Sequence, residues 1–191
     1  MDLKQVTKVK TNFVSEEIPD AKGIKDLKNW CNQFLKYKLI ELDNNSLGLS
    51  FRTEDGFIIT GKKLKPDLNT DCFVSVLNYD VYNNSLFIEG AVEPSPEAVM
   101  HYLIYNTRFE VNTILCGKHD SIIKHTKELK LVETTEEIPH GTIELANEVL
   151  DILKNNNFVV IKNYGFLSLG KTMKEAGELA LKIHKKASSL K

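Results

Sequence analysis

The sequence predicts a single α/β domain, a three-layer αβα sandwich in which a mainly antiparallel or mixed β-sheet is covered by helices on both faces. Three observations support this fold class. The length of 191 residues suits one hydrophobic core. Strand-like segments alternate with about four amphipathic helices. The strands between residues 47 and 90 follow one another through short turns, so they are expected to pair as hairpins. We expect residues 1–22 to form an N-terminal arm and residues 23–191 the domain.

The first half of the chain supplies most of the hairpin-connected strands. The first twenty residues alternate weakly between apolar and polar and predict a loose arm or an edge strand. A helix is expected from Ile24, because apolar residues then recur at helical spacing as far as Leu35. The period changes in "LGLSFR" and "GFIIT", two predicted strands around the turn "TEDG". "CFVSVLNYD" and "SLFIEG" continue the strand pattern around the turn "YNNS".

The second half alternates helices and strands. "SPEAVMHYLIYNTRFE" predicts a helix that begins near Ser95 and Pro96 and carries Glu97, His101, Tyr105 and Arg108 on one face. "VNTILC" predicts a strand, and residues 119–137 a short helix and a strand. The remaining predicted elements are a helix in "IPHGTIELANEVLDILKNNN", a strand in "FVVIKNYG" and a helix in "KTMKEAGELALKIHKKASSL".

The composition excludes several classes of protein. The chain is 42% hydrophobic and 27% charged, with a formal net charge of −1, so it has no overall field for nucleic acid or an anionic membrane. Its three cysteines are far apart and predict neither a disulfide framework nor a zinc ribbon. No apolar run is long enough for a signal peptide or a membrane span. We expect a cytoplasmic protein that binds neither nucleic acid nor membrane.

The stretch "ILCGKHDS" places a cysteine, a lysine and a histidine at the predicted end of a strand. Cys116, His119 and His125 have the spacing C-x2-H-x5-H, which could supply three metal ligands. Lys118 could instead provide a fixed positive charge or form a Schiff base. The third reading is a polar strand end without chemistry, and the residues leave all three open.

Taken in order, the segments of the chain resemble the class II aldolase/adducin family over nearly the whole length from about Ile24. The four most telling are "LSFRTEDGFIITG", "EGAVEPSPEAVMHYLIYNTRFEVNTIL", "IPHGTIELANEVLDIL" and "VVIKNYGFLSLGKTMKEAGELA". The resemblance implies the three-layer αβα domain. In the family's enzymes, which act on phosphorylated sugars, histidines of an HTH and an NHG motif bind zinc and a glutamate acts as general acid/base. The resemblance also implies a homo-oligomer, in some members a tetramer.

The resemblance assigns the general acid/base position to Glu97, but it does not carry over the zinc ligands. The two HTH histidines fall on Cys116 and Lys118, and the NHG histidine falls on Tyr164. Neutral tyrosine is a poor zinc ligand, and a lysine places a cation where the metal would lie. We therefore expect no cofactor, unless Cys116 and His119 rebuild a zinc site.

The sugar-phosphate cradle implied by the resemblance is only partly kept. Its asparagine falls on Gly48, and Pro96 replaces one of its two serines. The residues that could still hold an anion are Ser50, Thr60, Gly61, Lys62 and Ser95. His101 matches a histidine one turn after the family's glutamate and could orient Glu97.

We therefore expect a homologue that lacks the family's zinc histidines. It would bind a small phosphorylated or carboxylated ligand or act in an assembly, and the balance favours a protein that is not an enzyme. The alternative is an active aldehyde-lyase or related sugar-phosphate enzyme, with Glu97 as general acid/base and a rebuilt metal site or Lys118 as the electrophile. The sequence does not identify the ligand or the substrate.

Overall fold

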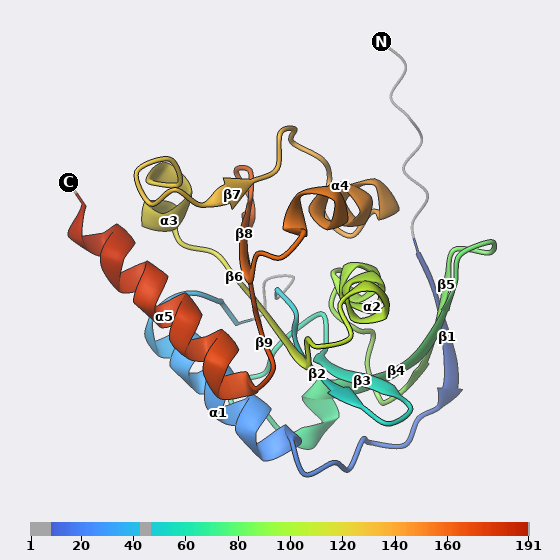
Figure 1. Ribbon diagram of the computed structural model, residues 1–191. Helices are drawn as coiled ribbons and strands as arrows, with labels where there is room; N and C mark the ends of the chain where they lie inside the picture. Colours follow the sequence, from blue (N-terminus) through green and yellow to red (C-terminus); the bar gives the residue numbers. More distant parts are fainter. Residues whose placement is uncertain (1–8, 43–46, 191) are drawn as a thin grey trace.

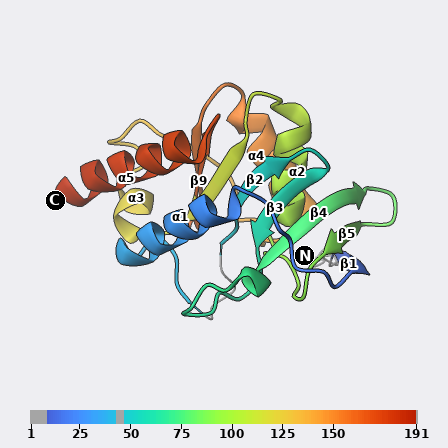
Figure 2. The same cartoon turned by 90° about the horizontal axis from the view of Figure 1, so that it is seen from below.

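A computed structural model describes residues 9–42 and 47–190. In this part of the chain one nine-stranded mixed sheet lies between two layers of helices (Figures 1 and 2). The predicted fold class, an αβα sandwich with a mainly antiparallel or mixed sheet, is confirmed.

The strands of the first half of the chain form one side of the sheet, and the strands of the second half form the other side. Its strand order is β1-β5-β4-β3-β2-β6-β9-β8-β7, and only the two outer pairs, β1 with β5 and β7 with β8, are parallel. The strands are β1 (Lys10–Ser15), β2 (Leu49–Thr53), β3 (Gly56–Thr60), β4 (Phe73–Asp80), β5 (Ser85–Glu89), β6 (Thr113–Gly117), β7 (Val132–Glu133), β8 (Phe158–Ile161) and β9 (Gly165–Gly170).

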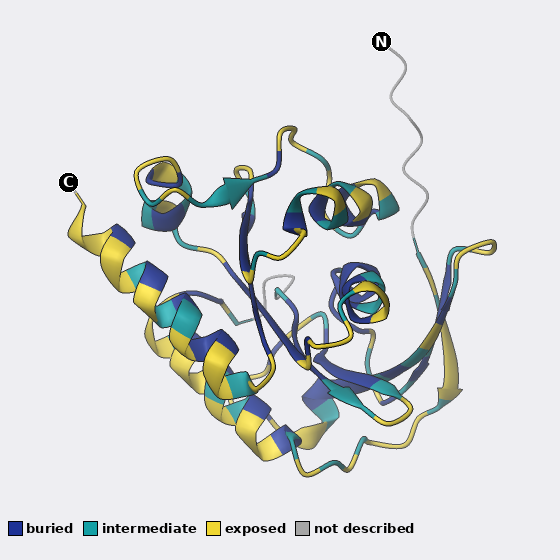
Figure 3. Ribbon diagram, viewed as in Figure 1, coloured by how far each residue is buried: buried dark blue, intermediate teal, exposed yellow. Residues whose placement is uncertain are grey.

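The helices divide between the two faces of the sheet. One face is covered by α2 (Ala98–Thr107) and α4 (Ile143–Leu153), and the other by α1 (Ile24–Lys36), α3 (Asp120–Lys124) and α5 (Met173–Ser189), with a short 3₁₀ helix at Thr70–Cys72. Each layer encloses its own cluster of buried apolar side chains, and the buried sides of the helices face the sheet (Figure 3). Burial of these two apolar faces is the main force that holds the layers together.

Local sequence signals explain two of the helix starts. The hydroxyls of Thr142 and Thr172 accept the backbone N–H groups of Leu145 and Glu175, so α4 and α5 are capped by their threonines. Helix α2 begins differently from the prediction, because Glu97 is its N-cap residue and no side chain caps it. The hydroxyl of Ser95 is used by the Glu97 carboxylate instead.

The segment "FVVIKNYGFLSLG" forms a hairpin of β8 and β9, and only its first strand was predicted. Asn163 adopts a left-handed conformation in the turn (φ 57°), which asparagine tolerates. Gly165 follows, and a Cβ atom there would lie 2.5 Å from the carbonyl oxygen of Gly117. The glycine therefore lets the turn approach the end of β6, where the Tyr164 hydroxyl reaches Glu97.

A loose arm and an edge strand were the two alternatives for the first twenty residues, and Lys10–Ser15 form the strand β1, which pairs with β5 at one end of the sheet. Residues 1–8 lie outside the described residues, so the domain boundary at residue 22 stays a prediction. Within the described ranges, no helix has both the length and the apolar character needed to cross a membrane.

We expect Gly165→Ala to lower the free energy of unfolding by about 1–3 kcal/mol, because the new methyl group meets backbone rather than a movable side chain. Urea denaturation would measure the loss. Asn163→Gly in the same turn is the matched control, since glycine also adopts a positive φ there, and we expect a change below about 1 kcal/mol. Equal effects of the two substitutions would contradict the close-approach argument.

Candidate functional site

The carboxylate of Glu97 lies at the start of α2 and is almost completely buried, with an exposed fraction of 1%. A buried carboxylate needs hydrogen-bond donors in place of water. Two hydroxyl groups serve this purpose: Ser95 donates to Oε2 and Tyr164 donates to Oε1. Glu97 is thus held by one donor from its own helix start and one from the β8–β9 turn, 67 residues away.

Tyr164 occupies the position of the third zinc histidine in the resemblance, and here it acts as a hydrogen-bond donor. Burial, together with the negative charge of Glu97, raises the pKa of the Tyr164 hydroxyl well above its ordinary value, so the proton stays on the oxygen. The other side of its ring stacks on His140 at a centroid distance of 5.0 Å and an interplanar angle of 10°. The tyrosine therefore links the buried carboxylate to an exposed imidazole.

A second group of buried polar side chains connects Cys116 to the far end of α2. The Sγ atom of Cys116 lies 3.1 Å from His101 Nε2, and His101 Nδ1 lies 2.7 Å from the Ser50 hydroxyl. Ser50 in turn lies 2.7 Å from the Tyr105 hydroxyl. The sequence placed His101 on the same helix face as Glu97, but in the structure its ring bonds to Cys116 and Ser50.

The electrostatics of this group keep it uncharged. Burial lowers the pKa of His101 to about 3, and burial raises the pKa of Tyr105. Burial, and secondly the charge of Glu97, raise the pKa of the Cys116 thiol well above its ordinary value. A neutral imidazole has one donor and one acceptor nitrogen, so the four side chains can satisfy one another without an ion.

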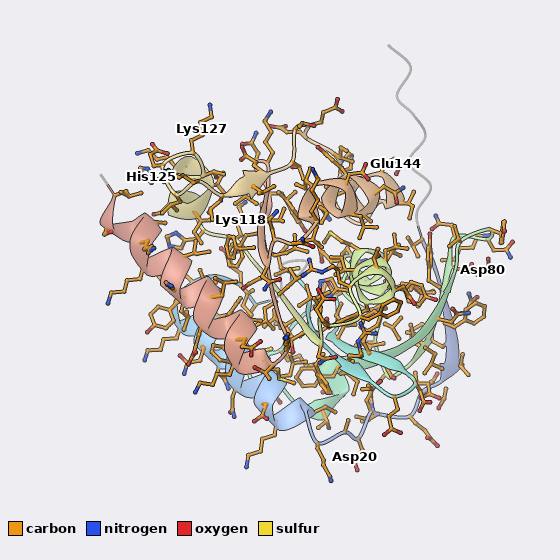
Figure 4. The ribbon with its side chains drawn as sticks, in the orientation of Figure 1. Asp20, Asp80, Lys118, His125, Lys127 and Glu144 are labelled. Atoms are coloured by element: carbon orange, nitrogen blue, oxygen red, sulfur yellow. The ribbon has the colours of Figure 1, made fainter. Side chains whose placement is uncertain are left out.

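The other residues of "ILCGKHDS" do not join Cys116. Lys118 is exposed, and its backbone N–H donates to the carbonyl of Leu39 at 2.7 Å. The Nδ1 atom of His119 accepts the N–H of Ser121, and its ring lies 4.4 Å from that of His184 on α5. His125 lies beyond α3, at a separate place from Lys118 (Figure 4). The structure thus does not bring Cys116, His119 and His125 together.

These residues do not fit the zinc ion of the family's enzymes. The thiol of Cys116 is paired with His101, the hydroxyl of Tyr164 with Glu97, and Lys118 is a cation. Over residues 9–42 and 47–190, no three or more histidine, cysteine, aspartate or glutamate side chains are grouped so as to hold a metal ion.

Most of the predicted phosphate cradle is occupied by the protein's own hydrogen bonds. Ser50 is buried within the group described above, the Thr60 hydroxyl accepts the N–H of Leu49 at 3.1 Å, and the N–H of Gly61 donates to Cys72 at 2.7 Å. A Cβ atom on Gly48 would lie 3.1 Å from the Ser95 hydroxyl and 2.9 Å from Ile59, so the family's asparagine would not fit without a shift. Lys62 is the charged member of the five predicted residues, and its side chain is about half exposed.

Lys62 lines a cavity of about 470 Å³, and Ser95, whose hydroxyl donates to Glu97, lines it too. Its ammonium group lies 3.4 Å from Glu93, and both side chains are about half exposed. Thr11 and His140 are polar residues of the cavity wall that were not predicted as site residues from the sequence. The lining residues include Val9, Thr11, Leu86, Ser95, Pro96 and His140. His140 was missed because its place depends on Tyr164, a contact that no local pattern in "IPHGT" encodes.

We expect Tyr164→Phe to destabilise the protein by about 1–3 kcal/mol, because it leaves one oxygen of a buried carboxylate without its donor. Chemical denaturation at neutral pH would measure this change. Tyr102→Phe is the matched control, since its hydroxyl donates to Asn78 at an exposed position and its loss should cost less than about 1 kcal/mol. An unchanged free energy of unfolding in Tyr164→Phe would show that the hydroxyl does not stabilise Glu97.

We also expect the cysteines to resist alkylation in the native state. All three are buried; burial raises the pKa of Cys31 to about 12, and burial also raises the pKa of Cys116 well above its ordinary value. Iodoacetamide reacts with the thiolate, so at about pH 8 mass spectrometry should find the native chain unmodified and the urea-unfolded chain modified three times. Rapid labelling of Cys116 in the folded protein would contradict this arrangement.

The comparison with solved structures supports the same fold. An L-fuculose 1-phosphate aldolase matches with a TM-score of 0.72 and 17% identity, covering 90% of this chain and 85% of the aldolase. A sugar-phosphate aldolase from Thermotoga maritima matches with a TM-score of 0.69 and 12% identity, covering 87% and 92%. The N-terminal class II aldolase domain of a Thermoplasma acidophilum protein matches with a TM-score of 0.64 and 16% identity, covering 91% and 95%.

No protein-family model and no curated protein sequence matches the chain. At these identities the structural matches establish the fold and nothing beyond it. The predicted resemblance is confirmed at that level: the chain has the fold of the class II aldolases.

Proposed function

We propose that this protein is a non-zinc relative of the class II aldolases that binds a small phosphorylated or carboxylated ligand in the cavity lined by Lys62, Ser95 and His140. The observation that carries the proposal is the hydrogen bond from Tyr164 to Glu97. A carboxylate with both oxygens occupied by hydroxyl donors is held in place and shielded from a substrate. The same tyrosine stands where the resemblance expects a metal-binding histidine.

The cavity itself favours an anion. Lys62 contributes a cation at its rim, and His140 offers an imidazole that can donate a hydrogen bond. Because Glu93 pairs with Lys62 through half-exposed side chains, this ion pair is weak and can be exchanged for a ligand. The solved structures named as sugar-phosphate aldolases make a phosphorylated sugar the first class of ligand to test.

Thermal unfolding with added ligand tests the proposal. L-fuculose 1-phosphate, inorganic phosphate and citrate would serve as the probes, and a ligand at 100 times its dissociation constant should add about 2.7 kcal/mol of stability. Lys62→Ala should abolish the stabilisation. Lys63→Ala, an exposed neighbour outside the cavity, should keep it. Absence of stabilisation by all three probes would favour a role in assembly without a ligand.

The alternative is an active aldehyde-lyase in which Glu97 is the general acid/base, with a rebuilt metal site or Lys118 as the electrophile. The observation that favours it is the presence of a glutamate at the start of α2 in a chain with an aldolase fold. Retro-aldol cleavage of L-fuculose 1-phosphate that is lost in Glu97→Gln would support the alternative. Metal analysis of the untagged protein would then decide between a metal and Lys118.

A further inference from the structure

The C-terminal ends of α1 and α5 enclose a groove of about 710 Å³ on the side of the sheet opposite to Glu97. Its surface combines an aromatic ring, an aliphatic side chain and an imidazole, contributed by Tyr37, Leu181 and His184. Tyr37 is 40% exposed, and its ring contacts that of His184 at 5.9 Å. The groove therefore offers an apolar floor that is open to solvent.

Lysines surround this floor. Lys182 and Lys185 line the groove from α5, and Lys36 and Lys38 flank Tyr37 at the end of α1. All four side chains are exposed, and in the described part of the chain none of them forms an ion pair. Because the whole chain has a net charge of −1, the groove is a local positive surface on a slightly acidic protein.

A segment with the complementary character connects β1 to α1. Glu16, Glu17 and Asp20 are exposed there, and they flank Ile18, which is 46% exposed. The same four letters, "EEIP", recur at residues 136–139, but Ile138 packs against the core beneath α2 and α4. The segment 16–20 is thus the copy of this motif that presents its isoleucine to solvent.

The segment and the groove cannot meet within one molecule. The segment leads into the start of α1 (Figure 1). The groove is lined by Tyr37, which directly follows the last turn of the same helix. Thirteen helical residues separate them by about 20 Å. Two complementary surfaces at opposite ends of one rigid helix can pair only between molecules, either reciprocally in a two-fold dimer or head to tail in a ring or a filament.

We propose that residues 16–20 of one copy dock into the α1–α5 groove of a second copy. Ile18 packs against Tyr37 and Leu181, and the carboxylates of Glu16, Glu17 and Asp20 lie among the lysines of the rim. The docking residues do not include Glu97, Lys62 or any other residue of the ligand cavity. Self-association and ligand binding can therefore succeed or fail independently.

Sedimentation velocity of the full chain at low salt tests the proposal. We expect concentration-dependent self-association that weakens as salt is added. Ile18→Asp and the double variant Lys182→Glu/Lys185→Glu should each weaken it about tenfold or more. The exposed controls Tyr82→Asp and Lys63→Glu lie outside both surfaces and should associate as the wild type does. Circular dichroism would verify that each variant is folded.

Charge exchange provides the decisive comparison. Glu16→Lys/Glu17→Lys alone should also lose self-association, and mixing it with Lys182→Glu/Lys185→Glu should restore a mixed complex, because opposite charges then face each other again. A wild-type chain that stays monomeric would overturn the proposal. So would self-association that survives both reversals, or a mixture of the two variants that stays monomeric.

Discussion

The arrangement of the site depends on one constraint: a carboxylate buried at the start of α2 must be hydrogen-bonded by the protein. Glu97 meets it with hydroxyls from Ser95 and Tyr164, and the second of these requires the β8–β9 turn to lie against the end of β6. That approach is permitted by Gly165, whose missing side chain leaves room for the carbonyl of Gly117. The glycine, the turn and the tyrosine therefore act together, and a change in any one of them alters the environment of the carboxylate.

The same constraint explains why the neighbouring side chains are neutral. Close to one buried negative charge, a thiolate or tyrosinate would add repulsion to the cost of desolvation, so Cys116 and Tyr164 keep their protons. His101 is neutral because it is fully buried, which lowers its pKa to about 3. A metal site requires the opposite balance, with several deprotonated donors around a cation. The hydrogen bonds seen here stabilise the protonated forms.

The sequence predicted the fold better than the site, and the reason is the range of the interactions. Helical stripes such as Ile24 to Phe34, and the turn "TEDG", are encoded within a few residues, so α1 and the β2–β3 hairpin could be predicted. Strand β9 was missed because glycine begins and ends it and weakens the strand pattern. The contacts of Glu97 with Tyr164 and of Cys116 with His101 join distant segments, and no local pattern specifies them. The motif order located these residues but not their hydrogen-bond partners.

The distribution of charge adds a feature that composition alone conceals. A net charge near zero suggested no particular partner, yet the charge is unevenly distributed, with an acidic segment before α1 and a group of lysines at the other end of that helix. The carboxylates and the lysines interact over distances near the Debye length, whereas Ile18 and the apolar floor of the groove interact only at contact. In the proposed complex the charges would therefore orient the two copies, and Ile18 packed on the apolar floor would hold them together. The α1–α5 groove and Glu97 lie on opposite faces of the sheet, so the proposed docking groove is separate from the proposed ligand cavity.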